Sequence, residues 1–560
     1  MKLKAKIINT DILIIGGGAA GCFSAIKAGE NKNVKILIAE KANIKRSGCL
    51  AAGVNALNAY ITEGETPESF LEYVKDEFSG VIREDLVYSI AKRLNSVTKD
   101  IEESGLPILK DEEGKYISRG KRSIKINGEN IKPLLADEVA RRNNVEVLNG
   151  LNIIDYIVEE NEVIGAYGFS IKEDVLYVIY SKAVICATGG AAGIYKPNNP
   201  GFSRHKMWYS PFNTGAGYAM GIRAGAEMTT FEMRFIALRC KDTIAPTGTI
   251  AQGIRTPQIN GQGELYVKNY GKGTTINRLY STLMENIRGR GPCYLKTEGI
   301  SEEQEQDLLK AYLNMAPAQT LKWIENNSSP STENVEIGGT EPYIVGGHTA
   351  SGYWVDTYRR TTLNGLFAAG DVAGGSPKKY VTGCFAEGEI AAEAALDYIK
   401  SKEMKVHEEE EINNKLQEVN RYFTNKARQF SIEELESEMQ TIMDEYAGGI
   451  SKYYRYTEEG LRIASDKIAE LKNAAKELKA EDTHDLLFIY EILDRLEVAK
   501  VLIAHLLARK ETRWKCYEDN ADYPERDDEN WVKYVNSVYK DGEVKVILRD
   551  IVRKDEVYEH

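Results

Sequence analysis

The sequence predicts an α/β protein in which a Rossmann-like nucleotide-binding domain is split along the chain and joined to an inserted domain and a helical C-terminal domain. Three observations support this prediction. Residues 10–40 read as a strand, a glycine-rich turn, a helix and a second strand. Two further apolar strands that end in glycine occur at 182–190 and 365–371, and beyond residue 400 the chain becomes charged and helical. One sheet is therefore expected to combine segments that lie far apart in the sequence.

The first unit of this sheet carries a glycine-rich turn between strand and helix. Residues 11–15 form an apolar strand, the small residues of 19–29 suit a helix, and 34–39 form a second apolar strand. The turn at 16–21 reads Gly-Gly-Gly-Ala-Ala-Gly, so it allows a tight bend, a close approach of the backbone to a pyrophosphate, and close helix packing. Glu40 ends the second strand, where a carboxylate accepts ribose hydroxyls. We predict a dinucleotide site here, with a purely structural turn as the alternative.

Composition changes along the chain indicate the domain boundaries. A chain of 560 residues is too long for one core, because single cores stop growing at roughly 250–300 residues. The middle stretch is richer in Gly, Thr and Asn and has its own helical pattern at 301–314, whereas apolar residues recur at helical spacing over 461–478 and 486–496. We predict the split nucleotide-binding domain at 1–234 and 343–404, the inserted domain at 235–342 and the helical domain at 405–560.

The charge balance excludes one large class of function. Lys and Arg total 72 and Asp and Glu total 84, which gives a net charge of −12, whereas a duplex-binding protein needs a basic surplus. The longest apolar stretches, 12–20 and 498–507, fall short of the ~20 residues that cross a bilayer. The N-terminus runs into the glycine turn rather than a cleavage site. We therefore expect a cytoplasmic protein that binds no nucleic acid and has no transmembrane segment.

The seven cysteines are scattered, odd in number and contain no C-x-x-C pair. This spacing excludes a zinc ribbon or a set of iron–sulfur ligands within the chain. We expect reduced thiols and no bound metal.

Two later motifs identify the nucleotide. Residues 187–190 (Ala-Thr-Gly-Gly) and 369–371 (Ala-Gly-Asp) resemble the paired motifs of FAD-containing two-dinucleotide-fold proteins. Residues 46–48 (Arg-Ser-Gly) and 51–53 (Ala-Ala-Gly) resemble the flavin-contacting stretch of the fumarate reductase/succinate dehydrogenase flavoprotein superfamily. Members of that superfamily that attach FAD covalently carry a histidine where this chain has Gly48, so the resemblance implies non-covalent FAD. The residues expected to bind it are Gly16, Gly18, Ala19, Ala20, Gly21, Glu40, Lys41, Ser47, Gly48, Ala52, Gly53, Thr188, Gly189, Gly370, Asp371 and Glu387.

A longer set of motifs narrows the resemblance within this superfamily. The stretches at 204–235, 346–352, 359–375 and 377–384 closely resemble the α (flavoprotein) subunit family of dissimilatory-type adenylylsulfate reductases, as do Thr-Arg-Trp, Asp-Tyr-Pro and Asn-Trp in the C-terminal part. The resemblance implies that the inserted domain is a capping domain that closes over the substrate. It also implies a reaction in which reduced flavin attacks the sulfur of adenylyl sulfate through N5, forms a flavin–sulfite adduct and releases the nucleotide and sulfite.

The same resemblance implies a partner. In that family a ferredoxin-like β subunit with two 4Fe–4S clusters delivers the electrons, in an αβ or α2β2 assembly. Such a partner explains why this chain lacks cluster cysteines.

Five residues fall on active-site positions of the family: Asn58, Glu129, Trp208, Arg239 and His348. Because the substrate carries an anionic sulfate and phosphate, we expect Arg239 and His348 to clamp the sulfate and offset charge. Trp208 would form a flat wall, Asn58 would hydrogen-bond an oxygen or the flavin, and Glu129 would accept from adenine or ribose. The alternatives are an ion-pair arginine, a structural histidine, a core tryptophan, a turn asparagine and a surface carboxylate.

One departure from the family concerns the substrate. Residues 118–122 read Ser-Arg-Gly-Lys-Arg where the family has an acidic or neutral stretch. We hypothesise that Arg119, Lys121 and Arg122 receive a further phosphate, which would make 3′-phosphoadenylyl sulfate the substrate. The alternative is a solvated basic hairpin.

Two other functions remain open from the sequence. A fumarate reductase or aspartate oxidase would need an arginine proton donor in the capping domain, for which Arg255 or Arg288 is available although the surrounding motifs do not match. A flavin subunit that only relays electrons would bind FAD without forming a sulfite adduct.

Overall fold

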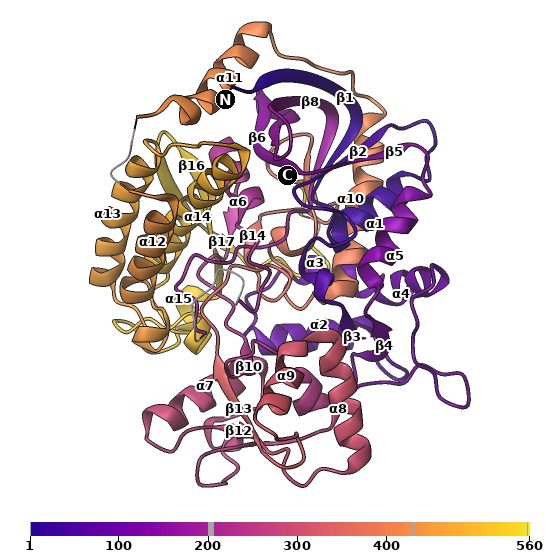
Figure 1. The fold of residues 1–560 in the computed structure, drawn as a ribbon, viewed down its shortest axis with the longest axis vertical. Coiled ribbons are helices and arrows are strands. Elements are labelled where there is room, and N and C mark those ends of the chain that lie inside the picture. Colours follow the sequence, from indigo (N-terminus) through magenta and orange to yellow (C-terminus); the bar gives the residue numbers. More distant parts are fainter. Residues whose placement is uncertain (1, 200–206, 427–429, 557) are drawn as a thin grey trace.

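The computed structural model describes residues 2–199, 207–426, 430–556 and 558–560 (Figure 1), so residues 204–206 of the family-like stretch lie outside the described part. A seven-stranded sheet has the order β5-β2-β1-β8-β7-β6, with β15 beside β8. Its strands are β1 (Lys4–Ile15), β2 (Ile36–Glu40), β5 (Val145–Asn149), β6 (Leu151–Glu159), β7 (Glu162–Ser170), β8 (Val175–Cys186) and β15 (Leu366–Ala368).

The central strands of this sheet are parallel and end at one edge. Ile15 of β1 lies opposite Ala39 of β2 and Cys186 of β8, and Ala368 of β15 also lies opposite Cys186. This register confirms the prediction that distant segments share one sheet. The glycine-containing segments that follow these strands therefore meet at the same edge.

Alternation along each strand builds two cores, one on each face of the sheet. Ile12 and Ile14 belong to one core together with residues of α1 and α10, whereas Leu13 and Ile15 belong to the other together with residues of α13 and α14. Helices thus cover both faces, which explains the nearly continuous apolar runs of β1 and β2. The helices and the small two-stranded sheet of this part are α1 (Ala19–Ala28), α2 (Pro67–Glu77), α3 (Glu84–Ala91), α4 (Leu94–Glu103), α5 (Ile131–Ala140), α6 (Ala216–Ala224), α10 (Tyr380–Ile399), β3 (Val54–Leu57) and β4 (Ile124–Gly128).

The inserted segment forms a unit with its own sheet and its own core, at the bottom of Figure 1. Its sheet has the order β10-β13-β12-β11. Its elements are β10 (Leu238–Cys240), β11 (Gln258–Ile259), α7 (Thr275–Ile287), β12 (Tyr294–Leu295), α8 (Glu302–Met315), α9 (Pro317–Glu325) and β13 (Val335–Gly339). Ser301 and Gln304 form a capping box at the start of α8, which confirms the expected helix. We refer to residues 235–342 as the inserted unit.

The C-terminal part is helical, as expected, but it ends in a hairpin that the sequence analysis did not predict. Strands β16 and β17 pair with each other, and β16 also pairs with β9 of the nucleotide-binding part. Asp541 and Gly542 both have positive φ in the tight turn between them, and Asp-Gly is a typical hairpin signal. The elements here are α11 (Glu409–Thr424), α12 (Ile432–Tyr446), α13 (Glu458–Ala475), α14 (Thr483–Ala508), α15 (Asp528–Trp531), β16 (Lys533–Lys540) and β17 (Glu543–Asp550), in a sheet with β9 (Met228–Thr229) and β14 (Gly352–Tyr353).

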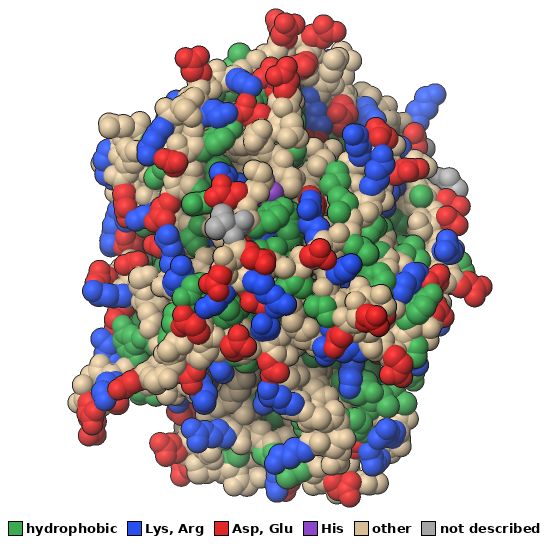
Figure 2. Space-filling view, turned by 180° about the vertical axis from the view of Figure 1, so that it is seen from behind, with side chains coloured by type: hydrophobic (Ala, Val, Ile, Leu, Met, Phe, Trp, Pro, Cys, Tyr) green, Lys and Arg blue, Asp and Glu red, His purple; other side chains and the backbone are tan. Residues whose placement is uncertain are grey.

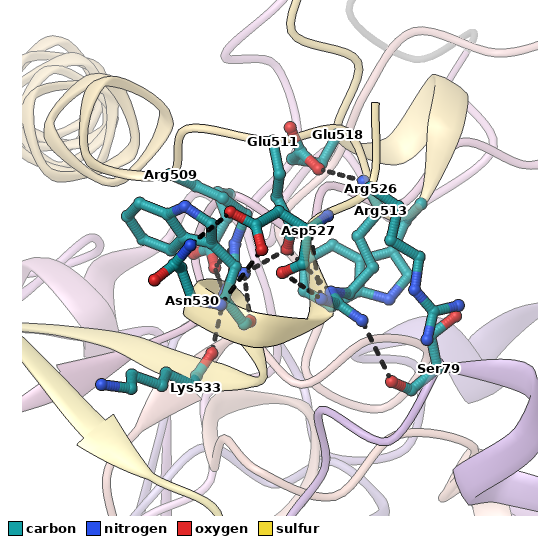
Figure 3. Close-up of polar contacts among 12 residues, drawn as sticks. Ser79, Arg509, Glu511, Arg513, Glu518, Arg526, Asp527, Asn530 and Lys533 are labelled. Carbon is teal, nitrogen blue, oxygen red and sulfur yellow. Dashed lines mark hydrogen bonds and ion pairs between the residues drawn. The ribbon is translucent and has the colours of Figure 1, made fainter. Parts of the chain in front are cut away.

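A buried charge network fixes the chain between α14 and β16 (Figure 3). Glu511 Oε1 accepts hydrogen bonds from Arg509 Nη1 at 2.8 Å and from Arg513 Nε at 2.7 Å. Arg509 also donates to Glu232, and Arg513 donates to the carbonyl of Ser79. The network therefore ties the C-terminal part to two distant segments of the nucleotide-binding part.

The surface of the protein carries charged side chains of both signs. On the face shown in Figure 2, basic and acidic side chains are interspersed rather than gathered by sign. Within the described ranges, no helix combines the length and the apolar character needed to cross a bilayer.

Arg234 joins distant segments mainly through backbone carbonyls, and its Nη1 also donates to the Tyr195 hydroxyl at 3.3 Å. Its fully buried guanidinium donates to the carbonyls of Gly448 at 2.6 Å, Tyr454 at 2.9 Å and Tyr517 at 3.0 Å. These carbonyls would lose their partner together if the guanidinium were removed.

We predict that Arg234→Met lowers the free energy of unfolding by at least about 3 kcal/mol, because each hydrogen bond to a charged group contributes about 1.5–3 kcal/mol. The thermal midpoint of the full chain measures the change. Arg462→Met is the matched control, since that side chain is 72% exposed on α13. Equal midpoints for the two variants would contradict the prediction.

Candidate active site

A cavity of about 630 Å³ opens at the edge where β1, β2, β8 and β15 end. All but two of the predicted cofactor residues line it: Gly16, Gly18, Ala19, Ala20, Glu40, Lys41, Ser47, Gly48, Ala52, Gly53, Thr188, Gly189, Gly370 and Asp371. The two exceptions, Gly21 and Glu387, do not line the cavity but lie next to the backbone of Gly16 and Gly370, which does.

The glycine turn has the conformation that its sequence predicts. Gly16 has φ 97°, and a Cβ atom on Gly21 would lie 1.9 Å from the Gly16 carbonyl oxygen, so Gly21 permits close helix packing rather than cofactor contact. The Gly17 N–H donates to Glu40 Oε2 at 2.8 Å. The turn is therefore held from the side by the carboxylate that the sequence assigned to the ribose.

Open polar groups in this cavity fit FAD. Helix α1 starts without a side-chain cap and without an acidic residue in its first turn, so its N-terminus can receive a pyrophosphate. A Cβ atom on Gly18 would meet nothing within 4 Å, which leaves room for a close backbone approach. Ser47 Oγ and Thr214 Oγ1 are buried beside the cavity and have no hydrogen-bond partner among the described residues. Both hydroxyl groups are therefore available to hydrogen-bond a polar ligand.

Asp371 also lines the cavity. Its Oδ2 accepts a hydrogen bond from the Tyr209 hydroxyl at 2.7 Å, and burial raises the pKa of its carboxyl group. Glu387 lies behind it, fully buried, and does not line the cavity. It pairs with Arg359 and with Lys379, and it accepts the Gly370 N–H at 2.9 Å. The structure therefore corrects the expected contact of Glu387: this residue holds the Gly370 backbone in place.

Three of the five predicted active-site residues, Asn58, Trp208 and His348, line the same cavity, as does Tyr380. Residues 243–249 of the inserted unit contribute to the same wall. The ring centroids of Trp208 and His348 are 5.3 Å apart, and His348 stacks on Phe235 at 4.3 Å. Burial lowers the pKa of His348 to about 3, so its imidazole is neutral near pH 7.

Arg239 lies close to this region without lining the cavity. Its side chain is 1% exposed, and Nη2 donates to the carbonyl of Asn198. Nε and Nη1 are buried and have no hydrogen-bond partner among the residues that the structure describes. An unsatisfied buried guanidinium is unusual in a folded protein, so these two donors are available to an anion.

The three cations at 119–122 do not converge. Arg119 lines the cavity and donates to Asn58 Oδ1 at 2.5 Å, with Nε buried and unpartnered. Lys121 is 74% exposed and pairs with Glu65 at 3.2 Å, and the Arg122 guanidinium lies over the Tyr73 ring at 4.0 Å. Among the described residues that line the cavity, only Lys41 and Arg119 carry a fixed positive charge.

Glu129 lies in a second, smaller cavity of about 140 Å³ between the two-stranded sheet β3-β4 and α8. Its Oε1 accepts a hydrogen bond from Asn314 of the inserted unit. Gly53, Asn55, Arg119 and Thr249 line both cavities, so the two share a wall.

Sequence reasoning missed Tyr380 and Asn55 as lining residues. Tyr380 belongs to the family-like stretch 377–384, and Asn55 lies three residues before Asn58. Both residues are therefore close in sequence to positions that the resemblance had already identified. All seven cysteines are free, and among the residues placed by the structure no group of His, Cys, Asp and Glu side chains could hold a metal ion.

Comparisons with known proteins agree with this geometry. Residues 11–384 match the family described as FAD binding domain, and residues 436–557 match the fumarate reductase flavoprotein C-terminal family. The adenylylsulfate reductase subunit alpha of Megalodesulfovibrio gigas is 28% identical over 95% of this chain and 93% of its own length.

Solved structures extend the similarity. The adenylylsulfate reductase of Archaeoglobus fulgidus is 32% identical with a TM-score of 0.93, over 99% of this chain and 97% of that one. An adenosine-5-phosphosulfate reductase in complex with sulfite, as a covalent adduct, gives 32% and 0.92 over the same shares. The chain therefore belongs to the family of the adenylylsulfate reductase α subunit, within the fumarate reductase superfamily of FAD-dependent oxidoreductases.

Proposed function

We propose that this chain is the catalytic flavoprotein subunit that reduces an adenosine phosphosulfate to sulfite and the adenosine phosphate. The observation that carries the proposal is that Asn58, Trp208 and His348 line the same cavity as the residues expected to bind FAD. These residues come from three distant segments, and the resemblance assigns all of them to the same site. When bound, FAD supplies two electrons and an N5 atom that can take the sulfur as a sulfite adduct.

The side chains around Asn58, Trp208 and His348 bind and orient an anion. Arg119 provides the positive charge at the cavity wall, and its contact with Asn58 fixes the amide that faces the reacting sulfur. Arg239 contributes the two unpartnered donors described above. Trp208 and Tyr380 add aromatic rings to the cavity wall, and each of them contacts the His348 ring.

His348 takes a different role from the one expected. The low pKa of its buried ring means that it does not offset charge at neutral pH. As a neutral ring between Trp208, Phe235 and Tyr380 it can still donate one hydrogen bond to a substrate oxygen. We therefore assign the charge to the arginines and orientation to His348.

The adenosine half of the substrate suits the second cavity. This cavity shares a wall with the FAD cavity, so a sulfate group beside the flavin can extend into it. Glu129 and the amides of Asn127 and Asn314 line it, and such groups pair with ribose hydroxyls and with the adenine edge.

Recognition of a 3′-phosphate on the substrate would depend on one of the three cations at 119–122. Only Arg119 of the three cations faces the cavities, because Lys121 pairs with Glu65 and Arg122 packs on Tyr73. If the enzyme prefers the 3′-phosphorylated nucleotide, Arg119 is the residue that reads the extra phosphate.

We also propose an iron–sulfur partner of ferredoxin type that carries 4Fe–4S clusters, in an αβ or α2β2 assembly. The relative from M. gigas is itself named as a subunit alpha, which supports a second subunit. The scattered free cysteines of this chain fit a protein that receives electrons through a partner.

Adding sulfite to the oxidised full chain should bleach the visible flavin band, because an N5 adduct interrupts the conjugation of the ring. The same preparation with its iron–sulfur partner should reduce adenylyl sulfate with a viologen donor. Flavin that does not respond to sulfite would favour an electron-relay subunit. Viologen oxidation with fumarate alone would favour a fumarate reductase.

Arg119→Gln should lower kcat/KM for the sulfonucleotide about 10–100-fold, because one charge-assisted contact contributes about 1.5–3 kcal/mol. Lys121→Gln is the matched control and should stay within about twofold, as expected of an exposed ion pair. Both variants are assayed with adenylyl sulfate and with its 3′-phosphorylated form. Equal turnover of the two nucleotides by the parent enzyme would exclude selection by a 3′-phosphate.

The His348 ring should not titrate between pH 5 and pH 8. Its folded pKa of about 3 lies below the ordinary value of 6.5, so the folded protein keeps the ring neutral while the unfolded chain protonates it. This group therefore adds no pH dependence above about pH 6.5 and destabilises the fold as the pH falls from there toward 3. Histidine NMR signals, assigned with His348→Gln, measure this. A His348 signal that titrates near pH 6.5 would contradict the assignment.

A further inference from the structure

Lys132 is a buried cation without an acidic partner. It lies in the first turn of α5, and its side chain is 0% exposed. Its Nζ donates to the carbonyl of Gly17 at 2.6 Å and to the carbonyl of Ile44, and it lies 3.9 Å from Cys22 Sγ. Among the residues that the structure describes, no carboxylate lies within ion-pair distance of this ammonium group.

The other two buried lysines lack this feature. Lys378 pairs with Glu77 at 3.1 Å, and Lys379 pairs with Glu387 at 3.0 Å. Burying an unpaired charge costs several kcal/mol, and a cation in the first turn of a helix also opposes the helix dipole. Lys132 therefore occupies a position that the fold alone does not favour.

The carbonyl that Lys132 holds belongs to the cofactor turn. The Gly17 carbonyl and the Gly18 N–H are parts of one planar trans peptide group, so they point in opposite directions. Lys132 does not line the FAD cavity, whereas Gly18 does. Because Lys132 draws the Gly17 carbonyl away from the cavity, the Gly18 N–H points toward it.

The two sides of this turn carry opposite charges. Glu40 accepts the Gly17 N–H at 2.8 Å, and Lys132 donates to the Gly17 carbonyl, so both peptide groups next to Gly17 are fixed by charged side chains. A cation on a carbonyl also polarises the peptide and strengthens its N–H as a donor. Both effects favour an anion in front of the turn, at the uncapped start of α1.

We propose that Lys132 is a positioning residue for the pyrophosphate of FAD, acting through the Gly17–Gly18 peptide without touching the cofactor. It orients the Gly18 N–H toward the cavity and adds a positive electrostatic potential behind the glycine turn. The phosphates in front of the turn in part compensate the buried charge. This inference rests on FAD binding and not on the reaction proposed above, so the two can fail separately.

The test compares ligands with and without the pyrophosphate, using the full chain depleted of FAD. Lys132→Met removes the charge at similar volume, and Lys132→Gln keeps a donor for the carbonyls. Dissociation constants of FAD, ADP and adenosine are measured by fluorescence and by competition. Lys132→Met should weaken FAD and ADP about 10–100-fold and leave adenosine within about twofold. Lys132→Gln should weaken ADP less than Lys132→Met.

The matched control is Lys402→Met, because Glu162 keeps Lys405 as a partner when Lys402 is removed. This variant should bind all three ligands as the parent does. The salt dependence of ADP binding is a second readout and should become shallower in Lys132→Met.

Equal weakening of ADP and adenosine, or unchanged ADP binding, would overturn the proposal. If removal of FAD lowers the thermal midpoint of the parent more than that of Lys132→Met, the compensation of the buried charge by the phosphates is supported. If both Lys132 variants stay unfolded in excess FAD, Lys132 serves the fold itself and the proposal is wrong.

Discussion

The shared register of β1, β2, β8 and β15 is the constraint on which the rest of the structure depends. Because these strands are parallel and end at one edge, their glycine segments enclose one cavity although up to 350 residues separate them in sequence. The segments that follow these strands supply glycines to that cavity wall, since the backbone itself must face the cofactor there. Residues of the inserted unit also line this cavity and the second cavity that shares a wall with it.

Buried charges in this protein act mainly on backbone groups. Arg234 joins three segments through carbonyls, and Glu387 holds the Gly370 N–H while it pairs with Arg359 and Lys379. Glu387 does not touch the expected ligand, yet it fixes the Gly370 peptide, which lines the cavity. Since a side chain one layer behind the wall has the same sequence signature as one in it, motif reasoning assigns both to the site.

The predictions that depend only on residues close together in sequence are confirmed. The glycine turn, the strands after it and the capped helix α8 are determined by neighbouring residues. The convergence of Asn58, Trp208 and His348 was accessible only through the family resemblance, because their separation in the chain gives no local signal. The hairpin β16–β17 was missed although Asp541 and Gly542 mark its turn, because both strands mix polar and apolar residues on a half-exposed sheet.

The sequence by itself determined the type of fold and the class of cofactor, because a G-x-G-x-x-G turn between apolar strands has one common structural solution. Only the tertiary structure decided which charges face the cavity. Arg119, Lys121 and Arg122 form one basic stretch in sequence, yet an acidic neighbour and an aromatic ring draw two of them away. His348 is a titratable residue in sequence, and burial among aromatic rings makes it neutral. Charge and protonation depend on what surrounds a side chain in space, which residue order does not specify.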